Sequence, residues 1–350
     1  MSMQQMYSFS KYKSETKEDW FNIANQENFL CINAKDEMLL EKYSDVNLVI
    51  YKEEVAGRKT PVGIFVSNGF RYKIKGFIKV LDATFGGLFI LKKYLEKTWE
   101  IKYYFYHKVV LDYFLKQLNV DFIDLMYSPL VAIEKPGFSY ISNPTPYAYV
   151  NNNSIVYMDL EGDFIQNIKS TPRYEIRKGL KYLDANIVLN SDNKNIIEHF
   201  LYLDEYKAKK IAISQFSRDY FDELLASKFY KALVCIDKIS LKPLSGIIYS
   251  IDGRMANYIY NSSTHEGKKC HSNKALLFLA MDESKSLGAK YFILGTGYVE
   301  SGNMLSVTTF KRSMSSNEVG CNIYRSPISL RGKLYTSLLL FRKRTNAEQR

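Results

Sequence analysis

The feature that most constrains the fold of this chain is an internal repeat. Residues 48–74, "LVIYKEEVAGRKTPVGIFVSNGFRYKI", and residues 233–259, "LVCIDKISLKPLSGIIYSIDGRMANYI", share an apolar strand, a polar turn, a proline, a second strand, a glycine turn and a third strand. Gly63 matches Gly246, and a helical segment and a further strand follow each copy. Short hairpins often look alike, but the shared order of strand, strand, strand, helix, strand extends beyond the hairpin. The repeat therefore predicts two similar α/β domains.

The join between the two domains is expected in the proline- and asparagine-rich stretch "SNPTPYAYVNNNS", which has the composition of a linker. We predict domains over 1–150 and 151–330, followed by a basic C-terminal tail over 331–350. In the second domain "NKALLFLAMDESKSLG" has helical periodicity and ends at Gly288, and "KYFILG" indicates a buried strand. The expected fold class is α/β, with a mixed, largely antiparallel sheet flanked by helices in each domain.

The composition narrows the class of protein. With 350 residues and 46% hydrophobic content, the chain can bury a core in each of two domains. Lys and Arg total 48 against 37 acidic residues, a net charge of +11, which favours an anionic partner, although many enzymes carry such a charge. The four cysteines are far apart and form no C-x-x-C pair, which fits a reducing cytoplasm. No apolar run approaches the ~20 residues of a membrane span, and the N-terminus does not resemble a signal peptide.

The stretch "YFILGTGYVESGNMLSVTTFKRSM", residues 291–314, begins as a buried strand that runs into Gly295 and Gly297. A dinucleotide fingerprint would need a third glycine three residues later and a helix start, but the next glycine is Gly302 and "NMLSVTT" does not indicate a helix start. We expect the two glycines to let the strand end bend and to bring backbone N–H groups near a ligand.

Metal and hydrolase chemistry find no support in the motifs. His265 and His271 are six residues apart beside Cys270, which is no recognised ligand spacing, so no metal site is predicted. Neither G-x-S-x-G nor H-E-x-x-H occurs, so a serine-hydrolase elbow and a zinc protease are also unsupported.

The segment "STPRYEIRKGLKYLDAN" indicates a helix with a basic face. Thr171 is predicted to cap the helix, with Pro172 as its first residue, and Arg173, Arg177 and Lys181 then fall at i, i+4 and i+8. A helix N-terminus with stacked cations suits a phosphate or diphosphate. A solvated basic face explains the same pattern equally well.

Several of these segments together resemble a known family. "PRYEIRKGLKYLDANI", "YLDEY", "FYKALVCID…SGIIYSIDGRMANYIYNSS", "NKALLFLAMDESKSLGAKYFILG" and "TTFKRSM" resemble, in this order, the second domain of Fem-like proteins. These tandem acetyltransferase-fold (GNAT) enzymes include the peptidoglycan bridge aminoacyltransferases and related N-acyltransferases of cell-surface polysaccharide pathways. "FGGLFI", residues 85–90, is similar to the glycine pair of the family's first domain, and the resemblance covers most of residues 40–325.

The resemblance implies an N-acyltransferase and assigns roles to residues. Phe310 and Lys311 match a Phe-Lys pair that places a cation at the reacting acyl group, with Gly295 and Gly297 beside the cleft. Acyl transfer to an amine passes through a tetrahedral oxyanion, which a fixed ammonium stabilises. The alternative for Lys311 is an ordinary surface lysine. The three cations of the basic helix would hold phosphate of the acceptor.

The acyl donor stays open. The resemblance implies no tightly bound cofactor and either acyl-CoA or aminoacyl-tRNA as donor, with the amine of an anionic, nucleotide- or lipid-linked amino sugar or peptidoglycan peptide as acceptor. The usual CoA loop, R/Q-x-x-G-x-G/A, is replaced by "STHEGKKCHSNKA" with one glycine, and the coiled-coil arm of some bridge enzymes is missing. The alternatives are a strictly aminoacyl-tRNA-dependent bridge enzyme and a non-catalytic basic module that binds nucleic acid. The oligomeric state is not predicted.

The C-terminal segment "LRGKLYTSLLLFRKRTNAEQR" combines apolar and basic residues. Leu334, Tyr335, Leu338 and Leu339 can line one side of a short helix that basic residues flank. We expect either peripheral contact of a cytoplasmic protein with the anionic inner face of the membrane, or docking of this helix on the second domain.

Overall fold

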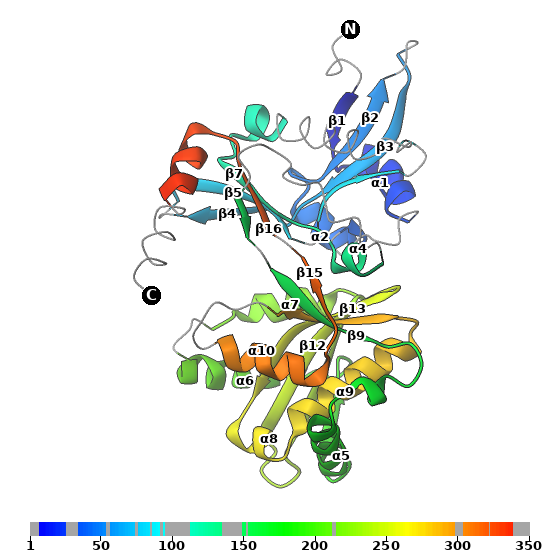
Figure 1. The fold of residues 1–350 in the computed structure, drawn as a ribbon, viewed down its shortest axis with the longest axis vertical. Helices are drawn as coiled ribbons and strands as arrows, with labels where there is room; N and C mark the ends of the chain where they lie inside the picture. Colours follow the sequence, from blue (N-terminus) through cyan, green and yellow to red (C-terminus); the bar gives the residue numbers. More distant parts are fainter. Residues whose placement is uncertain are drawn as a thin grey trace. The chain divides into compact units, whose positions relative to one another are not determined.

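A computed structural model describes residues 7–25, 34–53, 57–73, 76–84, 86–91, 94, 113–134, 149–151, 153–211, 215–297, 304–321 and 323–338. The chain forms two compact units (Figure 1). The first unit comprises Met1–Asn153 and Gly320–Arg350, and the second comprises Ser154–Val319. Each unit is described by itself.

The first unit is built from short strands and helices. Its strands are β1 (Tyr7–Lys11), β2 (Leu48–Glu53), β3 (Lys59–Val66), β4 (Phe70–Lys73), β5 (Ile78–Thr84), β6 (Gly87–Ile90), β7 (Phe122–Met126), β8 (Tyr149–Asn151) and β16 (Ile323–Pro327). Its helices are η2 (Ser14–Thr16), α1 (Lys17–Ala24), α2 (Glu37–Lys42) and α4 (Pro129–Glu134), and residues 113–118 and 330–338 are also helical.

The strands of the first unit lie in two sheets, of order β1-β2-β3-β6 and β4-β5-β7-β16-β8. β5 and β7 pair in parallel from Val80↔Phe122 to Thr84↔Met126, so the ladder continues to the end of both strands. The core of the unit lies between the sheets and the helix over 113–118, where the rings of buried Phe65 and Phe114 contact each other with their centroids 4.8 Å apart.

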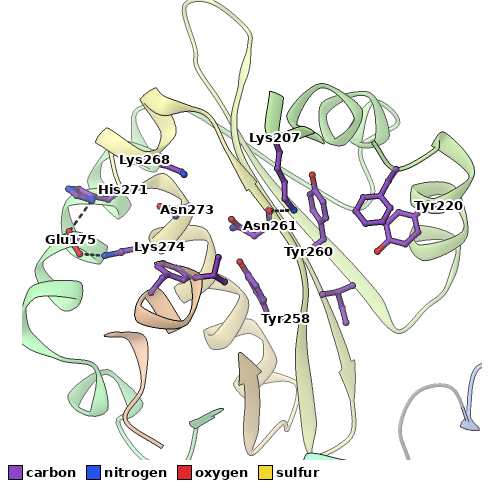
Figure 2. Close-up of a pocket in the computed structure, with 14 residues that line it drawn as sticks. Glu175, Lys207, Tyr220, Tyr258, Tyr260, Asn261, Lys268, His271, Asn273 and Lys274 are labelled. Atoms are coloured by element: carbon purple, nitrogen blue, oxygen red, sulfur yellow. Dashed lines mark hydrogen bonds and ion pairs between the residues drawn. The ribbon is translucent and has the colours of Figure 1, made fainter. Parts of the chain in front are cut away.

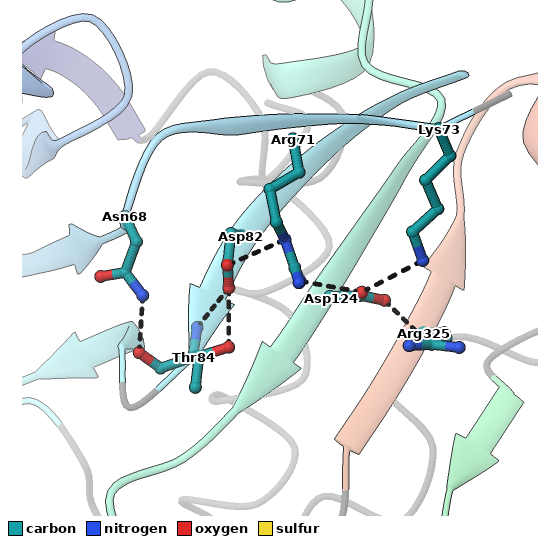
Figure 3. A network of polar contacts seen from close by, with 7 residues as sticks. All are labelled: Asn68, Arg71, Lys73, Asp82, Thr84, Asp124 and Arg325. Carbon is teal, nitrogen blue, oxygen red and sulfur yellow. Dashed lines mark hydrogen bonds and ion pairs between the residues drawn. The ribbon is translucent and has the colours of Figure 1, made fainter. Parts of the chain in front are cut away.

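A polar network ties four strands of the second of these sheets together (Figure 3). The carboxylate of Asp124 on β7 is 2% exposed and lies 3.1 Å from Arg71 Nη2, 3.9 Å from Lys73 Nζ and 2.9 Å from Arg325 Nε. Arg71 also pairs with Asp82 at 2.9 Å. Burial lowers the pKa of Lys73, and Asp124 opposes that shift. A buried carboxylate needs such partners, because desolvation would otherwise make its charge unfavourable.

The return of β16 to this sheet corrects the predicted domain limits. Residues 320–330 were expected in the second domain and 331–350 as a separate tail. Instead β16 pairs with β7 and β8, and Gly320–Arg350 belongs to the first unit. Apolar runs show that a strand will form but not which sheet edge it will join, so the sequence alone placed this strand with its neighbours along the chain.

The second unit carries one large sheet. Its strands are β9 (Ser154–Asp159), β10 (Ile187–Asn190), β11 (Tyr230–Ile236), β12 (Pro243–Asp252), β13 (Met255–Ser263), β14 (Tyr291–Thr296) and β15 (Glu318–Gly320). Its helices are η5 (Phe164–Asn167), α5 (Ser170–Asp184), α6 (Ile196–Ile211), α7 (Arg218–Ala226), α8 (His265–Lys269), α9 (Ser272–Ser286) and α10 (Met304–Met314).

The seven strands have the order β10-β11-β12-β13-β14-β9-β15, and helices cover both faces (Figure 1). Alternation along the strands explains the two layers. Cys235 and Ile247 pack with buried residues of α5 and α9 on one face, whereas Val234 and Ile248 pack with α6 and α7 on the other. Gly288, at φ +92°, follows the last turn of α9, as predicted.

The two copies of the sequence repeat form hairpins with the same irregularity. In the first copy the register of β2 and β3 shifts between Ile50 and Tyr51, and Tyr51 pairs with Pro61. In the second the register of β11 and β12 shifts between Cys235 and Ile236, and Ile236 pairs with Pro243. The third strand differs, because β13 pairs with β12 whereas β4 pairs with β5 in the other sheet. The repeat thus predicted the hairpin correctly but not the partner of the strand that follows.

Candidate acyl-transfer site

In the sheet of the second unit, the neighbouring strands β13 and β14 pair over only part of their length and then separate. Among the residues that the structure describes, the parallel ladder between them ends at Asn257↔Ile293, although both strands continue. Each strand then has a register shift against its other neighbour, at Ile248/Tyr249 opposite β13 and at Ile293/Gly295 within β14. Such bulges bend a strand and increase its twist. The two strands therefore diverge, unlike β5 and β7 of the first unit.

A pocket of about 600 Å³ occupies this side of the unit (Figure 2). Three groups of residues line it. They are Tyr258, Ile259, Tyr260 and Asn261 of the diverging part of β13; Lys268, His271, Asn273 and Lys274 around the start of α9, with Glu175 of α5; and Lys207, Phe216 and Tyr220 of the α6–α7 region with Val307 and Phe310 of α10. The volume is in the range of ligand sites of ordinary size.

One wall of the pocket carries a group of charges around Glu175. Its carboxylate accepts a hydrogen bond from Lys274 Nζ, and Nδ1 of His271 lies 3.7 Å from its other oxygen. Lys274 Nζ also lies 5.9 Å from the centroid of the Phe310 ring. Lys268 adds a cation whose pKa is lowered by burial and by Lys210. Lys274 is thus paired with Glu175, and Lys268 is a second lysine of the same lining, so this wall favours an anionic group of a ligand.

The middle of the pocket holds Lys207 and Asn261, between the wall with Glu175 and the side with Tyr220 (Figure 2). Lys207 Nζ is 3.5 Å from the backbone oxygen of Asn261 and 4.7 Å from the centroid of Tyr260. Burial lowers the pKa of Lys207, and Asp204 opposes that shift. Asp204 is itself occupied, since it accepts hydrogen bonds from Tyr260 and from the backbone of Phe216.

Asn261 has spare hydrogen-bonding capacity, because its buried Nδ2 has no hydrogen-bond partner among the described residues. A buried amide donor without a partner is unfavourable until a ligand or water supplies an acceptor. Lys207 and Asn261 together can therefore bind an oxygen of a ligand.

Aromatic side chains form much of the rest of the lining. Phe216 and Tyr220 stack with ring centroids 4.3 Å apart, and burial raises the pKa of both Tyr220 and Tyr258. These phenols stay neutral at physiological pH, so they can donate a hydrogen bond while their rings pack against an apolar part of a ligand.

The structure brings Gly295 and Lys311 together beside this opening. Lys311 on α10 is only 9% exposed, and burial lowers its pKa. Its Nζ lies 3.3 Å from the backbone oxygen of Thr296 and 2.9 Å from the position that a Cβ on Gly295 would occupy. Gly295 has φ +95°, so the strand end bends there, a conformation that glycine adopts without strain. Gly297 packs instead against Glu318, whose Oε1 would lie 2.6 Å from an added Cβ.

Phe310 lies on the pocket wall, whereas the neighbouring Lys311 is directed at the end of β14. Both belong to α10, which corrects the expectation that "NMLSVTT" does not start a helix. Buried Thr308, Lys311 and Met314 follow at intervals of three, so packing of one helical face stabilises this segment despite its β-branched residues.

The predicted phosphate-binding residues lie elsewhere. Helix α5 begins at Ser170 with Lys169 as an N-cap that has no side-chain hydrogen bond, so Thr171 is not the cap. Arg173 donates to Gln166 Oε1 at 2.8 Å and to the backbone oxygen of Ile168 at 3.0 Å.

Arg177 and Lys181 are exposed, and no member of the basic face lines the pocket. Glu175 does line it, and two residues of helix turn the side chain by roughly 200°, so Arg173 and Arg177 point away from it.

Sequence reasoning missed most of the pocket residues. The segment "STHEGKKCHSNKA" was noted only as a departure from a CoA loop, yet it supplies Lys268, His271, Asn273 and Lys274. Gly267 within it packs tightly, since a Cβ there would lie 2.3 Å from the backbone oxygen of Leu244. This glycine therefore serves close packing of the backbone rather than a phosphate cradle.

Solved structures share this fold over nearly the whole chain. FemX matches with a TM-score of 0.58 and 12% identity over 94% of this chain and 99% of its own. The C-terminal domain of a putative lysylphosphatidylglycerol synthetase from Agrobacterium fabrum matches at 0.51 and 12% over 92% and 94%. L-PGS from Bacillus licheniformis matches at 0.50 and 10% over 90% and 92%. No protein-family model matches the chain, and a sequence search of curated proteins finds no relative.

The fold defines the chain as a protein of two tandem GNAT-like α/β units. More closely, it has the fold of the Fem-like proteins, so the resemblance predicted from the motifs is confirmed at the level of the fold. In the described part of the chain, no helix is long and apolar enough to cross a membrane. The same residues include no group of three or more His, Cys, Asp or Glu side chains arranged to hold a metal ion.

Proposed function

We propose that the protein is an N-acyltransferase that moves an activated acyl or aminoacyl group onto an amine of an anionic cell-envelope precursor. The observation that supports this most directly is the pocket beside the divergence of β13 and β14, next to the buried Lys311 of α10, whose amine contacts the end of β14. The donor is acyl-CoA or aminoacyl-tRNA, neither held as a resident cofactor. One structural neighbour is described as a putative lysylphosphatidylglycerol synthetase, a name that denotes an aminoacylated lipid as product.

The proposed reaction assigns a role to the Lys311 ammonium. The acceptor amine attacks the acyl carbon, a C–N bond forms, and the bond to the donor sulfur or oxygen breaks, while the amine proton passes to the leaving group or to water. The tetrahedral intermediate carries a negative oxygen that a fixed cation in a dry site stabilises. Lys311 fits this role because, among the described residues, its amine forms no ion pair with a carboxylate and donates only to the Thr296 carbonyl, so no neighbouring acid neutralises its charge.

Binding would use two polar groups of the pocket lining. The wall with Lys268 and Lys274 suits the phosphate of a donor or of a nucleotide-linked acceptor. Lys207 and Asn261 suit an oxygen of the transferred group or of the acceptor. In this proposal the pocket wall replaces the basic face of α5 as the phosphate site. The guanidinium of Arg173 already donates hydrogen bonds to Gln166 and Ile168, which precede the helix.

Incubation of the protein with radiolabelled acyl-CoA and with labelled aminoacyl-tRNA, each with candidate amines, tests the proposal. Turnover with one donor is the expected result and identifies that donor. Lys311→Met should lower turnover by about 10²–10³, the usual effect of losing one oxyanion donor.

Lys311→Arg should restore little of this activity, because a planar guanidinium cannot occupy the position of a compact ammonium. Salt-sensitive RNA binding without turnover for any donor would contradict the proposal and favour a nucleic-acid-binding module.

A further inference from the structure

The C-terminal helix over 330–338 is firmly attached to the first unit at its start. Ser329 Oγ donates to Asp121 Oδ1 at 2.5 Å and accepts from the Gly332 amide at 3.0 Å, so it caps the helix and anchors it at once. Arg331 Nε donates to the same carboxylate oxygen at 3.0 Å. Asp121 is fully buried and also accepts from the backbone amide of Lys79. These contacts fix the direction in which the helix leaves the sheet.

One face of this helix packs on the sheet. The Tyr335 ring stacks on Phe122 with centroids 5.7 Å apart, next to buried Ile78 and Val80. Gly332 approaches the backbone so closely that a Cβ would lie 2.1 Å from the carbonyl oxygen of Asp121. The helix therefore docks on the first unit, and the expectation that it docks on the second domain is wrong. Leu339 lies outside the described residues.

The opposite face presents leucines to solvent. Leu330, Leu334 and Leu338 are 74%, 61% and 62% exposed, and their spacing of four residues places them in one stripe. Phe77 is 60% exposed, and the Arg331 guanidinium lies 5.4 Å from its ring centroid. A stripe of exposed leucines on a helix whose other face is already packed has no role in the fold of the described residues, so it marks an interaction surface.

The charges of the same segment indicate which kind of partner binds the leucine stripe. Residues 329–344 contain five cations and no acidic residue. Arg331 is already paired with Asp121, Lys333 lies on the helix, and Arg342, Lys343 and Arg344 follow in the sequence outside the described residues. A protein partner with a purely apolar patch would not require this bias. An anionic bilayer matches both features, because leucines enter the boundary of the acyl chains while lysine and arginine contact the phosphate groups.

We propose that helix 330–338 is a peripheral membrane anchor that lays Leu330, Leu334 and Leu338 into the surface of a bilayer containing anionic phospholipid. This binding is independent of the proposed acyl transfer, and it would hold the enzyme where lipid-linked acceptors are found. Electrostatic attraction contributes, so binding weakens as ionic strength rises.

Sedimentation with vesicles of phosphatidylcholine, with and without phosphatidylglycerol, tests the anchor on the full-length protein. The variant Leu334→Ser/Leu338→Ser should lower the partition coefficient onto phosphatidylglycerol vesicles by about tenfold or more, since two inserted apolar side chains are lost. The matched control is Ile239→Ser/Leu241→Ser, which removes two apolar residues that are 94% and 64% exposed at the turn between β11 and β12. This control should bind as the unchanged protein does.

Unchanged thermal stability of both variants should accompany these results, because the substituted side chains are exposed. Equal partition of the leucine variant and its control would overturn the anchor. So would a dimer of the unchanged protein in buffer that the leucine variant alone abolishes, because the stripe would then be an interface between copies. Vesicle binding needs no substrate, so its failure is distinct from failure of the acyl-transfer assay.

Discussion

Substitution of Gly295 by alanine tests how the end of β14 positions Lys311. The new Cβ would lie 2.9 Å from Lys311 Nζ, closer than real side-chain contacts, so the amine must move. Its contact with the Thr296 carbonyl is already 3.3 Å, and a shift of a few tenths of an ångström takes it beyond the roughly 3.5 Å at which a hydrogen bond is lost. We expect Gly295→Ala to release the lysine from the strand end.

The same substitution strains the backbone, since Gly295 has φ +95°. A side chain in a conformation of positive φ costs about 1–2 kcal/mol, which corresponds to a Tm lower by about 2–8 °C for a domain of this size. Gly288→Ala is the matched control. Gly288 has φ +92°, and nothing lies within 4 Å of its added Cβ, so it carries a similar strain without the contact to Lys311.

Thermal unfolding and trace acetylation of lysines, followed by mass spectrometry, separate the two effects. Both variants should lose similar stability, but only Gly295→Ala should raise the labelling rate of Lys311, by severalfold, and lower acyl-transfer turnover. Equal labelling of Lys311 in the two variants would refute the inferred coupling between the glycine and the lysine.

Three further predictions concern stability. Lys311→Met should raise Tm, and most strongly near pH 7. Burial lowers the pKa of Lys311, so the charged lysine destabilises the folded state, and this penalty fades as pH rises towards the unfolded pKa of about 10.4. A gain in Tm that does not depend on pH would contradict this. Asp124→Asn should lower the free energy of unfolding in urea by about 1–3 kcal/mol. This is less than the loss expected for a fully buried ion pair, because the cations around Asp124 are partly hydrated. High salt should reduce the difference in stability between the variant and the unchanged protein. Gly332→Ala should cost about 1–3 kcal/mol through overpacking against Asp121, and limited proteolysis near residue 330 should become faster.

The sequence predicted local structure well where the pattern was local. The hairpins of the repeat, the α9 helix with Gly288 at its end and the buried strand before Gly295 all follow from periodicity and turn residues. The spacing of Arg173 and Arg177 also gave a helix, but not the neighbours of its basic face. Gln166 belongs to the preceding turn, and only the folded chain shows that its amide oxygen accepts from Arg173.

The pocket could not be predicted because it depends on where strands part. Tyr258 and Asn261 belong to a strand that the repeat identified, yet their role follows from the register of β13 against β14, which ends at Asn257. Pairing register is a tertiary property, and a shift of one residue would exchange the faces of the strand. Phe310 was assigned through family resemblance and lies on the pocket wall, and the roles of Phe310 and Lys311 both stay predictions.

The chain leaves the first unit at Asn153 and returns to it at Gly320, so the second unit is an insertion within the first. During synthesis the ribosome therefore completes Ser154–Val319 before it makes β16, the strand that pairs with both β7 and β8. The second unit can fold while the first still lacks a central strand of one sheet, and β7 and β8 then present edges that can pair wrongly. Residues 320–338 thus complete the first unit. A nascent chain that stalls before residue 320 carries a second unit with its pocket, attached to a first unit that still lacks β16.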